Sequence, residues 1–352
     1  MSNILVTGGA GFIGIHTTIS LLEKGFNVII IDSLINSSIN AIDRLYSSSS
    51  SELNFSKSQL KFLKGDIRDF GFLRKVFLNQ KQLGKAIDIV IHFAGLKAVH
   101  ESILLPDLYW DNNVNGTAQL LKVMGENECK NIVFSSSATV YSLNEKSPLN
   151  ENSKLLPVDP YGETKLAVEN MLKRLSYDSN SSWKIISLRY FNPIGAHSSG
   201  LFGEAPVDTP NNLFPYLCEV GNSKREVLSI FGNDWPTPDG TCIRDFIHVM
   251  DLAEAHFSSL KYMNEKKSDF LILNVGTGKG TTVLELIRIF EKINKCTIPY
   301  EFVERRNGDS PKSIADNSLI LSTLDWINKR DLEDMCIDGW NWKLNNPNGY
   351  LS

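Results

Sequence analysis

The sequence predicts an α/β protein, with helices on both faces of a doubly wound, mostly parallel sheet and a smaller α/β domain after it. Three observations support this prediction. Short apolar runs alternate with helical stretches over residues 4–190. A glycine-rich turn follows the first apolar run directly. Beyond residue 190, glycine and proline become frequent, and the regular alternation stops until Asp251.

The first strand and the first helix flank the glycine-rich turn. Residues 4–7 form a short strand, the turn contains Gly8, Gly11 and Gly14, and a helix is expected over about 13–24. Glycines permit a tight turn and allow backbone N–H groups to approach a pyrophosphate at a helix N-terminus. Their spacing differs by one residue from the commonest dinucleotide fingerprint, and glycines after a strand can also form a plain turn.

A second strand over residues 28–31 ends at Asp32. The order of strand, glycine turn, helix, strand and terminal acid is that of a Rossmann-type unit, which makes the plain turn a minority alternative. A carboxylate at this place can accept a hydrogen bond from a ribose 2′-hydroxyl, and it would repel a 2′-phosphate. The unit therefore predicts NAD rather than NADP as cofactor.

The following stretch is polar. Residues 36–57 are expected to form a loop, with low-complexity serines at 47–51 and no assigned function. A strand over 60–63 leads to Asp66, which could meet an adenine or, equally well, cap the next helix.

Later strands end in small residues. Residues 87–93 form a buried strand that closes on Ala94 and Gly95, where a ligand could approach the backbone closely. His92 lies inside this apolar run and is interpreted as a core histidine with satisfied hydrogen bonds, not as a catalyst. The alternation continues with a helix over 112–127 and strands over 132–134 and 185–188.

A candidate catalytic site follows the strand over 132–134. Asp159 can cap a helix that has Pro160 at its first position, so Tyr161 and Lys165 lie one turn apart on one face. A free tyrosine has a pKa of about 10. A lysine cation, the positive helix end and a cationic nicotinamide would favour its phenolate. With the hydroxyl of Ser137, this group could remove a proton from a carbinol while hydride leaves.

The Tyr-x-x-x-Lys spacing alone occurs by chance on many helices and is then usually structural. The serine-rich strand end and the upstream glycine turn make a catalytic role the better interpretation here.

In the second half of the chain, Arg244 and Arg306 are candidates for binding a substrate pyrophosphate. The alternative for each is a surface ion pair, with Asp245 or Asp309.

Composition narrows the class of protein. The chain has 352 residues, 42% hydrophobic and 22% charged, with a net charge of −4. No basic run is longer than a pair such as Arg305–Arg306, which argues against nucleic-acid binding. Five scattered cysteines favour reduced thiols, and six dispersed histidines argue against a metal site. No apolar run reaches membrane-spanning length, and strand residues from Ile4 onward leave no room for a signal peptide. We expect a cytoplasmic protein without membrane, metal or nucleic-acid partners.

Length favours one large domain or two coupled domains. We expect a dinucleotide-binding domain over 1–190, completed by segments near 227–262, and a mainly substrate-binding domain over 191–352.

Taken together, the motifs resemble those of the UDP-glucose 4-epimerase family within the extended short-chain dehydrogenase/reductases. The resemblance covers essentially the whole chain, and as a set the motifs are highly specific. They are Thr7–Gly14, Phe93–Lys97, Phe134–Tyr141, Tyr161–Lys165, Tyr190–Pro193, Asn211–Leu213, Arg244–Asp251 and Arg305–Asp309.

The resemblance implies interconversion of UDP-galactose and UDP-glucose with tightly bound NAD, in a homodimer formed through a helical bundle. Tyr161 would take the proton of the sugar C4 hydroxyl, Ser137 would share that hydrogen bond, and Lys165 would bind the nicotinamide ribose. The implied cofactor positions are Gly8, Gly11, Phe12, Ile13, Gly14, Asp32, Asn36, Asp66, Ile67, Phe93, Ala94, Gly95, Lys97, Asn113, Ser135, Tyr161, Lys165 and Tyr190. The implied substrate positions are Lys97, Ser137, Tyr161, Asn192, Asn212, Leu213, Phe231, Arg244, Arg306, Asp309 and Ser313.

The chain departs from the family pattern in places. Ser142 and Leu143 follow Tyr141 where glycine is usual, His100 replaces a common glycine, and the serines at 47–51 resemble an insertion. Ser313 occupies the position whose size gates the hexose pocket in this family. Because serine is small, N-acetylated UDP-hexosamines are predicted as further substrates.

Three other functions compete with this interpretation. A nucleotide-sugar 4,6-dehydratase would need an acid–base pair beside the serine, but Ala138 and Thr139 follow Ser137. A UDP-glucuronate decarboxylase would need a group that binds the C6 carboxylate, which an arginine from a loop could supply. A non-catalytic NAD-responsive regulator could have lost Tyr161 or Lys165, yet both are present.

Overall fold

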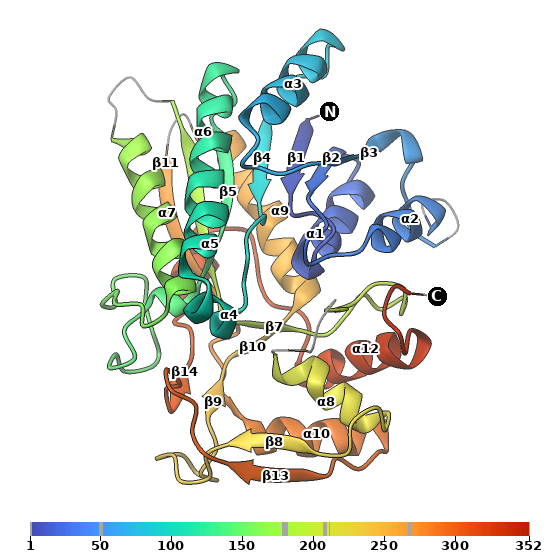
Figure 1. Ribbon diagram of the computed structural model, residues 1–352, viewed down its shortest axis with the longest axis vertical. Coiled ribbons are helices and arrows are strands. Elements are labelled where there is room, and N and C mark those ends of the chain that lie inside the picture. Colours follow the sequence, from blue (N-terminus) through green and yellow to red (C-terminus); the bar gives the residue numbers. More distant parts are fainter. Residues whose placement is uncertain are drawn as a thin grey trace.

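The computed structural model describes residues 2–48, 52–177, 182–206, 210, 212–266 and 269–351. Figure 1 shows a large sheet with its covering helices above a smaller lobe. The sheet has seven parallel strands, which confirms the predicted doubly wound α/β class. In spatial order these are β11 (Asp269–Val275), β6 (Lys184–Tyr190), β5 (Asn131–Ser137), β4 (Ile89–His92), β1 (Asn3–Thr7), β2 (Asn27–Asp32) and β3 (Leu60–Lys64).

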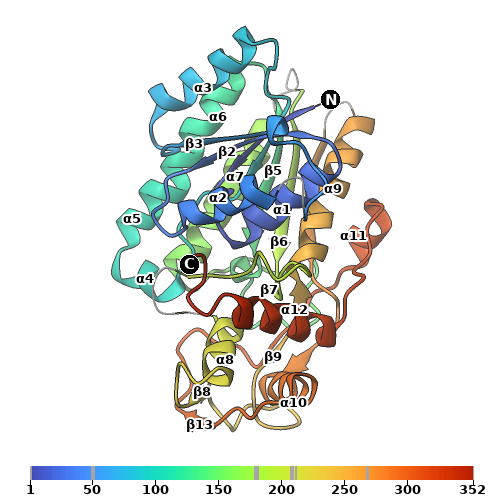
Figure 2. The same cartoon turned by 90° about the vertical axis from the view of Figure 1, so that its right-hand side faces the viewer.

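Alternate residues of each strand face opposite layers of helices. In β1, Ile4 and Val6 join a core with one set of helices, whereas Leu5 joins a core with the other set. The first set is α1 (Phe12–Glu23), α2 (Ile39–Ser48) and α9 (Val249–Glu265). The second set is α3 (Phe70–Gln82), α6 (Gly116–Glu126) and α7 (Pro160–Ser176). Figure 2 shows these two layers on either side of the sheet.

The chain leaves the sheet after β6 and later returns to it. Helix α9 packs against α1, and β11 pairs in parallel with β6, so segments from both halves of the sequence build the large sheet.

The smaller lobe has its own core of short strands and helices. Its helices are α8 (Leu213–Gly221), α10 (Val283–Asn294) and α12 (Leu332–Asn345). The short strands of the smaller lobe, and of the region where it joins the large sheet, are β7 (Asn192–Ile194), β8 (Leu228–Phe231), β9 (Ile243–Arg244), β10 (Phe246–His248), β12 (Thr281–Thr282), β13 (Tyr300–Val303) and β14 (Lys312–Ser313). The remaining helical segments are α4 (Val99–Leu104), α5 (Pro106–Trp110), the turns η1 (Lys57–Gln59), η2 (Asp111–Asn115) and η3 (Ala138–Val140), and α11 (Ser318–Thr323).

The loop predicted for residues 36–57 is wrong over residues 39–48. Helix α2 forms there because Ala41, Ile42 and Leu45 recur at helical spacing, and all three are fully buried. Of the serines at 47–51, those at 49–51 lie outside the described residues.

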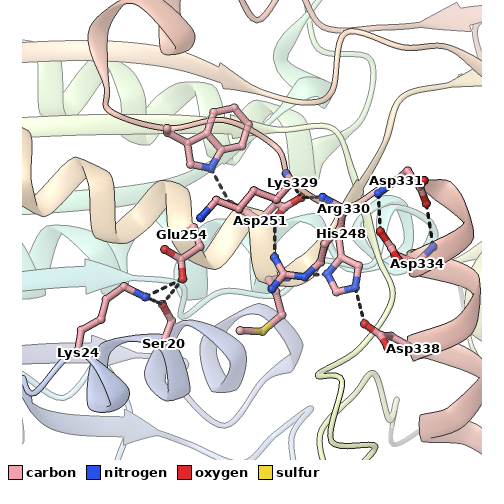
Figure 3. A network of polar contacts seen from close by, with 12 residues as sticks. Ser20, Lys24, His248, Asp251, Glu254, Lys329, Arg330, Asp331, Asp334 and Asp338 are labelled. Carbon is pink, nitrogen blue, oxygen red and sulfur yellow. Dashed lines mark hydrogen bonds and ion pairs between the residues drawn. The ribbon is translucent and has the colours of Figure 1, made fainter.

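A polar network ties α12 to α9 and α1 (Figure 3). Asp251 of α9 accepts hydrogen bonds from the backbone N–H groups of Lys329 and Arg330, and it pairs with the Arg330 guanidinium at 2.5 Å. His248 Nδ1 accepts from a backbone N–H, so its Nε2 carries the proton that it donates to Asp338 of α12 at 3.1 Å. The two lobes are therefore joined by buried polar contacts as well as by apolar packing.

No helix in the described ranges is long and apolar enough to cross a membrane. Among the same residues, no group of three or more histidine, cysteine and acidic side chains could hold a metal ion.

Candidate active site

The turn after β1 requires glycine at two places. Gly8 has φ +71°, and a Cβ there would lie 2.6 Å from the backbone nitrogen of Ala94. A Cβ at Gly14 would lie 2.3 Å from the carbonyl oxygen of Gly8. The backbone at the N-terminus of α1 is thus left open to an incoming group, which fits a dinucleotide pyrophosphate.

Asp32, at the end of β2, also organises the turn. Its carboxylate accepts hydrogen bonds from Ala10 N at 3.0 Å, Leu34 N at 2.9 Å and the Ser37 hydroxyl at 2.8 Å. The side chain predicted to contact a ribose therefore also holds the glycine turn against the loop after β2.

A cavity of about 640 Å³ lies over this turn, at the carboxyl ends of the strands. All but one of the expected cofactor positions are among its lining residues. These are Gly8, Gly11, Phe12, Ile13, Gly14, Asp32, Asn36, Asp66, Ile67, Phe93, Ala94, Gly95, Lys97, Ser135, Tyr161, Lys165 and Tyr190. The exception, Asn113, lies behind the wall, where it bonds both backbone groups of Leu96 and the hydroxyl of Thr164.

Asp66 does not cap the next helix. That position belongs to Asp69, whose carboxylate accepts from Phe72 N. Asp66 instead lines the cavity and holds Arg68, with 2.7 Å between its Oδ2 and Arg68 Nη2. The hydrogen bond with Arg68 lowers the pKa of Asp66.

Two of the three predicted catalytic residues, Tyr161 and Lys165, line the cavity, and the third, Ser137, ends the neighbouring strand β5. Asp159 caps α7 by accepting from Gly162 N at 2.8 Å, and Pro160 occupies the first helical position, as predicted. The side chain of Ser137, at the end of β5, acts on the Tyr161 hydroxyl and opposes the rise of its pKa. Lys165 Nζ donates to the carbonyl oxygen of Ser135 at 2.8 Å and lies 5.7 Å from the centre of the Tyr161 ring.

Burial dominates the ionisation of this pair. It raises the pKa of Tyr161 to about 12, against the opposing hydrogen bond of Ser137. Burial also lowers the pKa of Lys165 to about 8, against the opposing charge of Glu169. Burial therefore opposes the phenolate, which the lysine cation, the helix end and a cationic nicotinamide are expected to favour. Desolvation penalises the charged form of both groups more than their mutual attraction favours it.

His92 is a core histidine with satisfied hydrogen bonds, as predicted. Its ring nitrogens lie 2.6 Å from the hydroxyl of Thr7 and 2.8 Å from that of Thr117. Burial lowers its pKa to about 3, so it stays neutral.

Several expected substrate positions gather in the smaller lobe. Asp309 pairs with Arg244 at 3.3 Å and with Arg306 at 3.1 Å, and the Arg306 guanidinium lies over the ring of Phe231 at 4.6 Å. Ser313 of β14 is in register with Arg244 of β9. We call Phe231, Arg244, Arg306, Asp309 and Ser313 the small-lobe cluster.

For Arg244 and Arg306, the alternative to binding a pyrophosphate was a surface ion pair. The pair of Arg306 with Asp309 is present, whereas Arg244 does not pair with Asp245. Asp245 is fully buried, and it accepts from backbone N–H groups at residues 277, 278 and 315 instead.

Other substrate positions meet near the cavity wall. Asn212 begins α8 just before Leu213, and its amide donates to Glu204 at 3.1 Å. Lys97 pairs with the same carboxylate at 3.3 Å. Asn192 donates to the carbonyl oxygen of Asp245 at 3.1 Å.

Sequence reasoning missed one wall of the cavity, formed by residues 203–206 and Tyr350. The Tyr350 hydroxyl bonds both backbone groups of Gly203, and the Trp342 indole donates to Glu204 O at 3.1 Å. Arg44 of α2 lies over the rings of both Trp342 and Tyr350. We call residues 342–350 the C-terminal tail. No local motif marks this wall, since its parts are about 150 residues apart.

Comparison with known proteins identifies the family. Residues 5–338 match the family model described as GDP-mannose 4,6 dehydratase. The chain is 48% identical over 351 residues to a UDP-glucose 4-epimerase of Neisseria meningitidis, with 99% of each chain covered. Two solved UDP-glucose 4-epimerases have a closely similar fold. One, from Stenotrophomonas maltophila with bound NAD and formylated UDP-arabinopyranose, has TM-score 0.92, 41% identity and 99% of each chain covered.

The second solved UDP-glucose 4-epimerase, from Bifidobacterium longum in complex with NAD+ and UDP, has TM-score 0.91 and 42% identity. The comparison covers 99% of this chain and 100% of that one. The dehydratase name of the family model does not extend to the site, because Ala138 and Thr139 follow Ser137 where a dehydratase needs an acid–base pair. The chain therefore belongs to the UDP-glucose 4-epimerase family of the extended short-chain dehydrogenase/reductases.

Proposed function

We propose that Tyr161, Ser137 and Lys165 carry out the chemistry of this NAD-dependent UDP-glucose 4-epimerase. The observation that supports this most directly is the placement of the Lys165 ammonium 5.7 Å from the Tyr161 ring, where both residues line the cavity next to the end of β5 that carries Ser137. When bound, NAD supplies a reversible hydride acceptor at this place.

In the proposed reaction Tyr161 accepts the proton of the sugar C4 hydroxyl, and Ser137 hydrogen-bonds the same oxygen. Lys165 keeps positive charge near the phenol, which partly offsets the burial that disfavours the phenolate. The 4-keto sugar then turns over and is reduced on its other face, and Tyr161 returns the proton. The same residues therefore act in both half-reactions.

Epimerisation requires a firm hold on UDP and a loose hold on the hexose. We place UDP between the small-lobe cluster and residues Asn192, Asn212 and Leu213. Arg244 and Arg306 are suited to pyrophosphate because guanidinium groups bind phosphate oxygens in pairs. Both arginines now share Asp309, a pairing that an incoming pyrophosphate would have to replace.

The first test is the epimerisation of UDP-galactose by the purified protein, with and without added NAD. Formation of UDP-glucose without added NAD supports the proposal together with tight cofactor retention. If no UDP-glucose forms even with NAD supplied, the proposal fails.

We also propose that N-acetylated UDP-hexosamines are substrates, since Ser313, in register with Arg244 on the neighbouring strand, has a small side chain. Replacing Ser313 by tyrosine fills that space. The variant should keep activity on UDP-galactose and lose activity on UDP-N-acetylgalactosamine. An unchanged ratio of the two activities would contradict this role.

We propose a cytoplasmic homodimer formed through α4, α5 and the neighbouring α7. The apolar side chains exposed on the first two segments support this surface, because a monomer gains nothing from exposing them together. They are Val99, Ile103, Leu104, Leu105, Leu108 and Trp110, with Leu104 65% exposed. Light scattering during gel filtration should give twice the chain mass, and Leu104→Glu should give the single mass.

A further inference from the structure

A buried carboxylate lies one turn beyond Lys165 on the same helix. Tyr161, Lys165 and Glu169 are spaced by four residues and share one face of α7. Glu169 is 2% exposed, and it pairs with Arg189 of β6, which is 1% exposed. The pairing is bidentate, with Arg189 Nε 2.9 Å from Oε1 and Nη2 2.7 Å from Oε2.

The same carboxylate holds the end of strand β5. The hydroxyl of Ser136 donates to Glu169 Oε1 at 2.5 Å, and that of Ser187 donates to it at 3.3 Å. Ser136 lies between Ser135, whose carbonyl accepts from Lys165, and Ser137, whose side chain acts on the Tyr161 hydroxyl. One side chain of α7 therefore fixes the strand segment that contacts both catalytic groups of α7.

Arg189 is itself held in place. Its Nη1 donates to the Tyr141 hydroxyl at 2.9 Å and to the carbonyl oxygen of Glu151 at 3.1 Å. The Tyr141 hydroxyl in turn donates a hydrogen bond to Asn274 Oδ1 of β11 at 2.6 Å. Glu169 thus belongs to a hydrogen-bonded network of buried groups that reaches from α7 across β5 and β6 to β11.

We propose that Glu169 is a positioning residue for the epimerase reaction, which places Ser135 and Ser137 against α7 and keeps Lys165 in its ammonium form. This inference rests on the roles proposed above for Tyr161, Ser137 and Lys165. The charge of Glu169 opposes the burial that lowers the pKa of Lys165 to about 8. The other titratable groups that face Lys165 are Tyr161 on α7 and His92 on β4, and neither of these is charged near neutral pH.

The direct test is a ¹³C NMR titration of the lysine ε-carbons in the NAD-containing protein, with the Lys165 signal identified by its loss in Lys165→Met. Glu169→Gln should move the midpoint of Lys165 down by about one pH unit, because it removes the nearest negative charge. An unchanged midpoint would overturn the electrostatic part of the proposal. The readout needs no turnover, so it decides this inference even if the chain proves inactive on UDP-galactose.

Kinetics test the positioning. At pH 7.5 a midpoint one unit lower leaves about threefold less ammonium. Glu169→Gln should therefore lower kcat at least about threefold and leave KM nearly unchanged. It should also move the alkaline limb of the pH profile to lower pH. Glu169→Asp keeps the charge on a shorter side chain, so it should restore the alkaline limb while kcat stays below that of the parent.

Glu219→Gln is a matched control. Glu219 is also buried and pairs with Arg225 at 2.6 Å, but it lies on α8 in the smaller lobe. This variant should leave kcat and the pH profile unchanged. If Glu169→Gln lowered only the melting temperature, with kcat and pH profile like those of the control, Glu169 would be merely structural and the proposal would be wrong.

A single change at Glu169 leaves the Arg189 cation buried without its partner, which can prevent folding. The double variant Glu169→Leu/Arg189→Met removes both charges and keeps the volume. Its Lys165 midpoint and the alkaline limb should shift in the same direction as in Glu169→Gln but by less, because the positive charge of Arg189 is removed as well. A double variant with the titration and kcat of the parent would overturn the proposal.

Discussion

Replacing Lys165 by methionine should remove a buried charge while keeping most of the side-chain volume. Lys165 is 5% exposed, and burial lowers its pKa from 10.5 to about 8. Because the pKa is lower in the folded state, the stability that this group contributes is present above about pH 10.5 and is lost as the pH falls through about 8. Below that range the native protein holds an ammonium that would be better solvated in the unfolded chain.

The magnitude follows from the two pKa values. Their difference of about 2.5 corresponds to about 3 kcal/mol of unfolding free energy, all of it lost by pH 7. At pH 9.5 only about 1.4 kcal/mol is lost, because this pH is only about one unit below the pKa of the unfolded lysine and the native lysine is still mostly neutral. The methionine variant cannot titrate at this position. Its stability relative to the parent should therefore be about 2 kcal/mol more favourable at pH 7 than at pH 9.5.

Urea unfolding of the cofactor-free protein at the two pH values measures this difference. Other groups titrate in the same range, but their contributions cancel between parent and variant. Lys173→Met, on the exposed side of the same helix, is the control and should show no such change. If the parent and Lys165→Met lost stability in parallel between pH 7 and pH 9.5, the assignment of Lys165 as a buried, destabilising cation would be refuted.

Further changes separate catalysis from cofactor retention. Tyr161→Phe should lower kcat by about 10²–10⁴, the usual contribution of a proton acceptor, with little change in melting temperature; a variant with half the parent kcat would exclude that role. Gly14→Ala places a Cβ 2.3 Å from a carbonyl oxygen, so the absorbance of the purified variant should show no bound NAD. Gly11→Ala, whose Cβ would lie 3.4 Å from its nearest atom, should retain NAD. Tyr350→Phe removes the hydroxyl that is hydrogen-bonded to Gly203. The loss of one hydrogen bond of about 1 kcal/mol should speed NAD release up to about fivefold, as measured by stopped-flow fluorescence. An unchanged rate would show that this contact does not retain the cofactor.

The parts of the site that were predictable from sequence depend on local signals. The glycine turn lies between a strand and a helix that are adjacent in the chain, and the cap of α7 is set by Asp159 and Pro160 next to Tyr161. In such cases the backbone geometry follows from neighbouring residues, so the arrangement can be read before the fold is known.

The parts that were not predictable depend on long-range packing or on burial. Helix α2 was missed because its polar composition concealed a stripe of only three apolar residues. The wall formed by residues 203–206 exists only once Tyr350 packs against it. The raised pKa of Tyr161 depends on how completely the fold excludes water, and spacing along a helix carries no information about that.

The C-terminal tail has a consequence for protein synthesis. Tyr350 packs against Gly203, and its backbone carbonyl accepts from Asn40 of α2, so this wall of the cavity is built from residues made at very different times. Domains generally fold as they emerge from the ribosome, N-terminal portions first. The nascent chain can form the glycine turn early, but it cannot close the cavity around a nucleotide until residue 350 has left the ribosome. Stable capture of NAD is therefore expected only after both lobes have been synthesised.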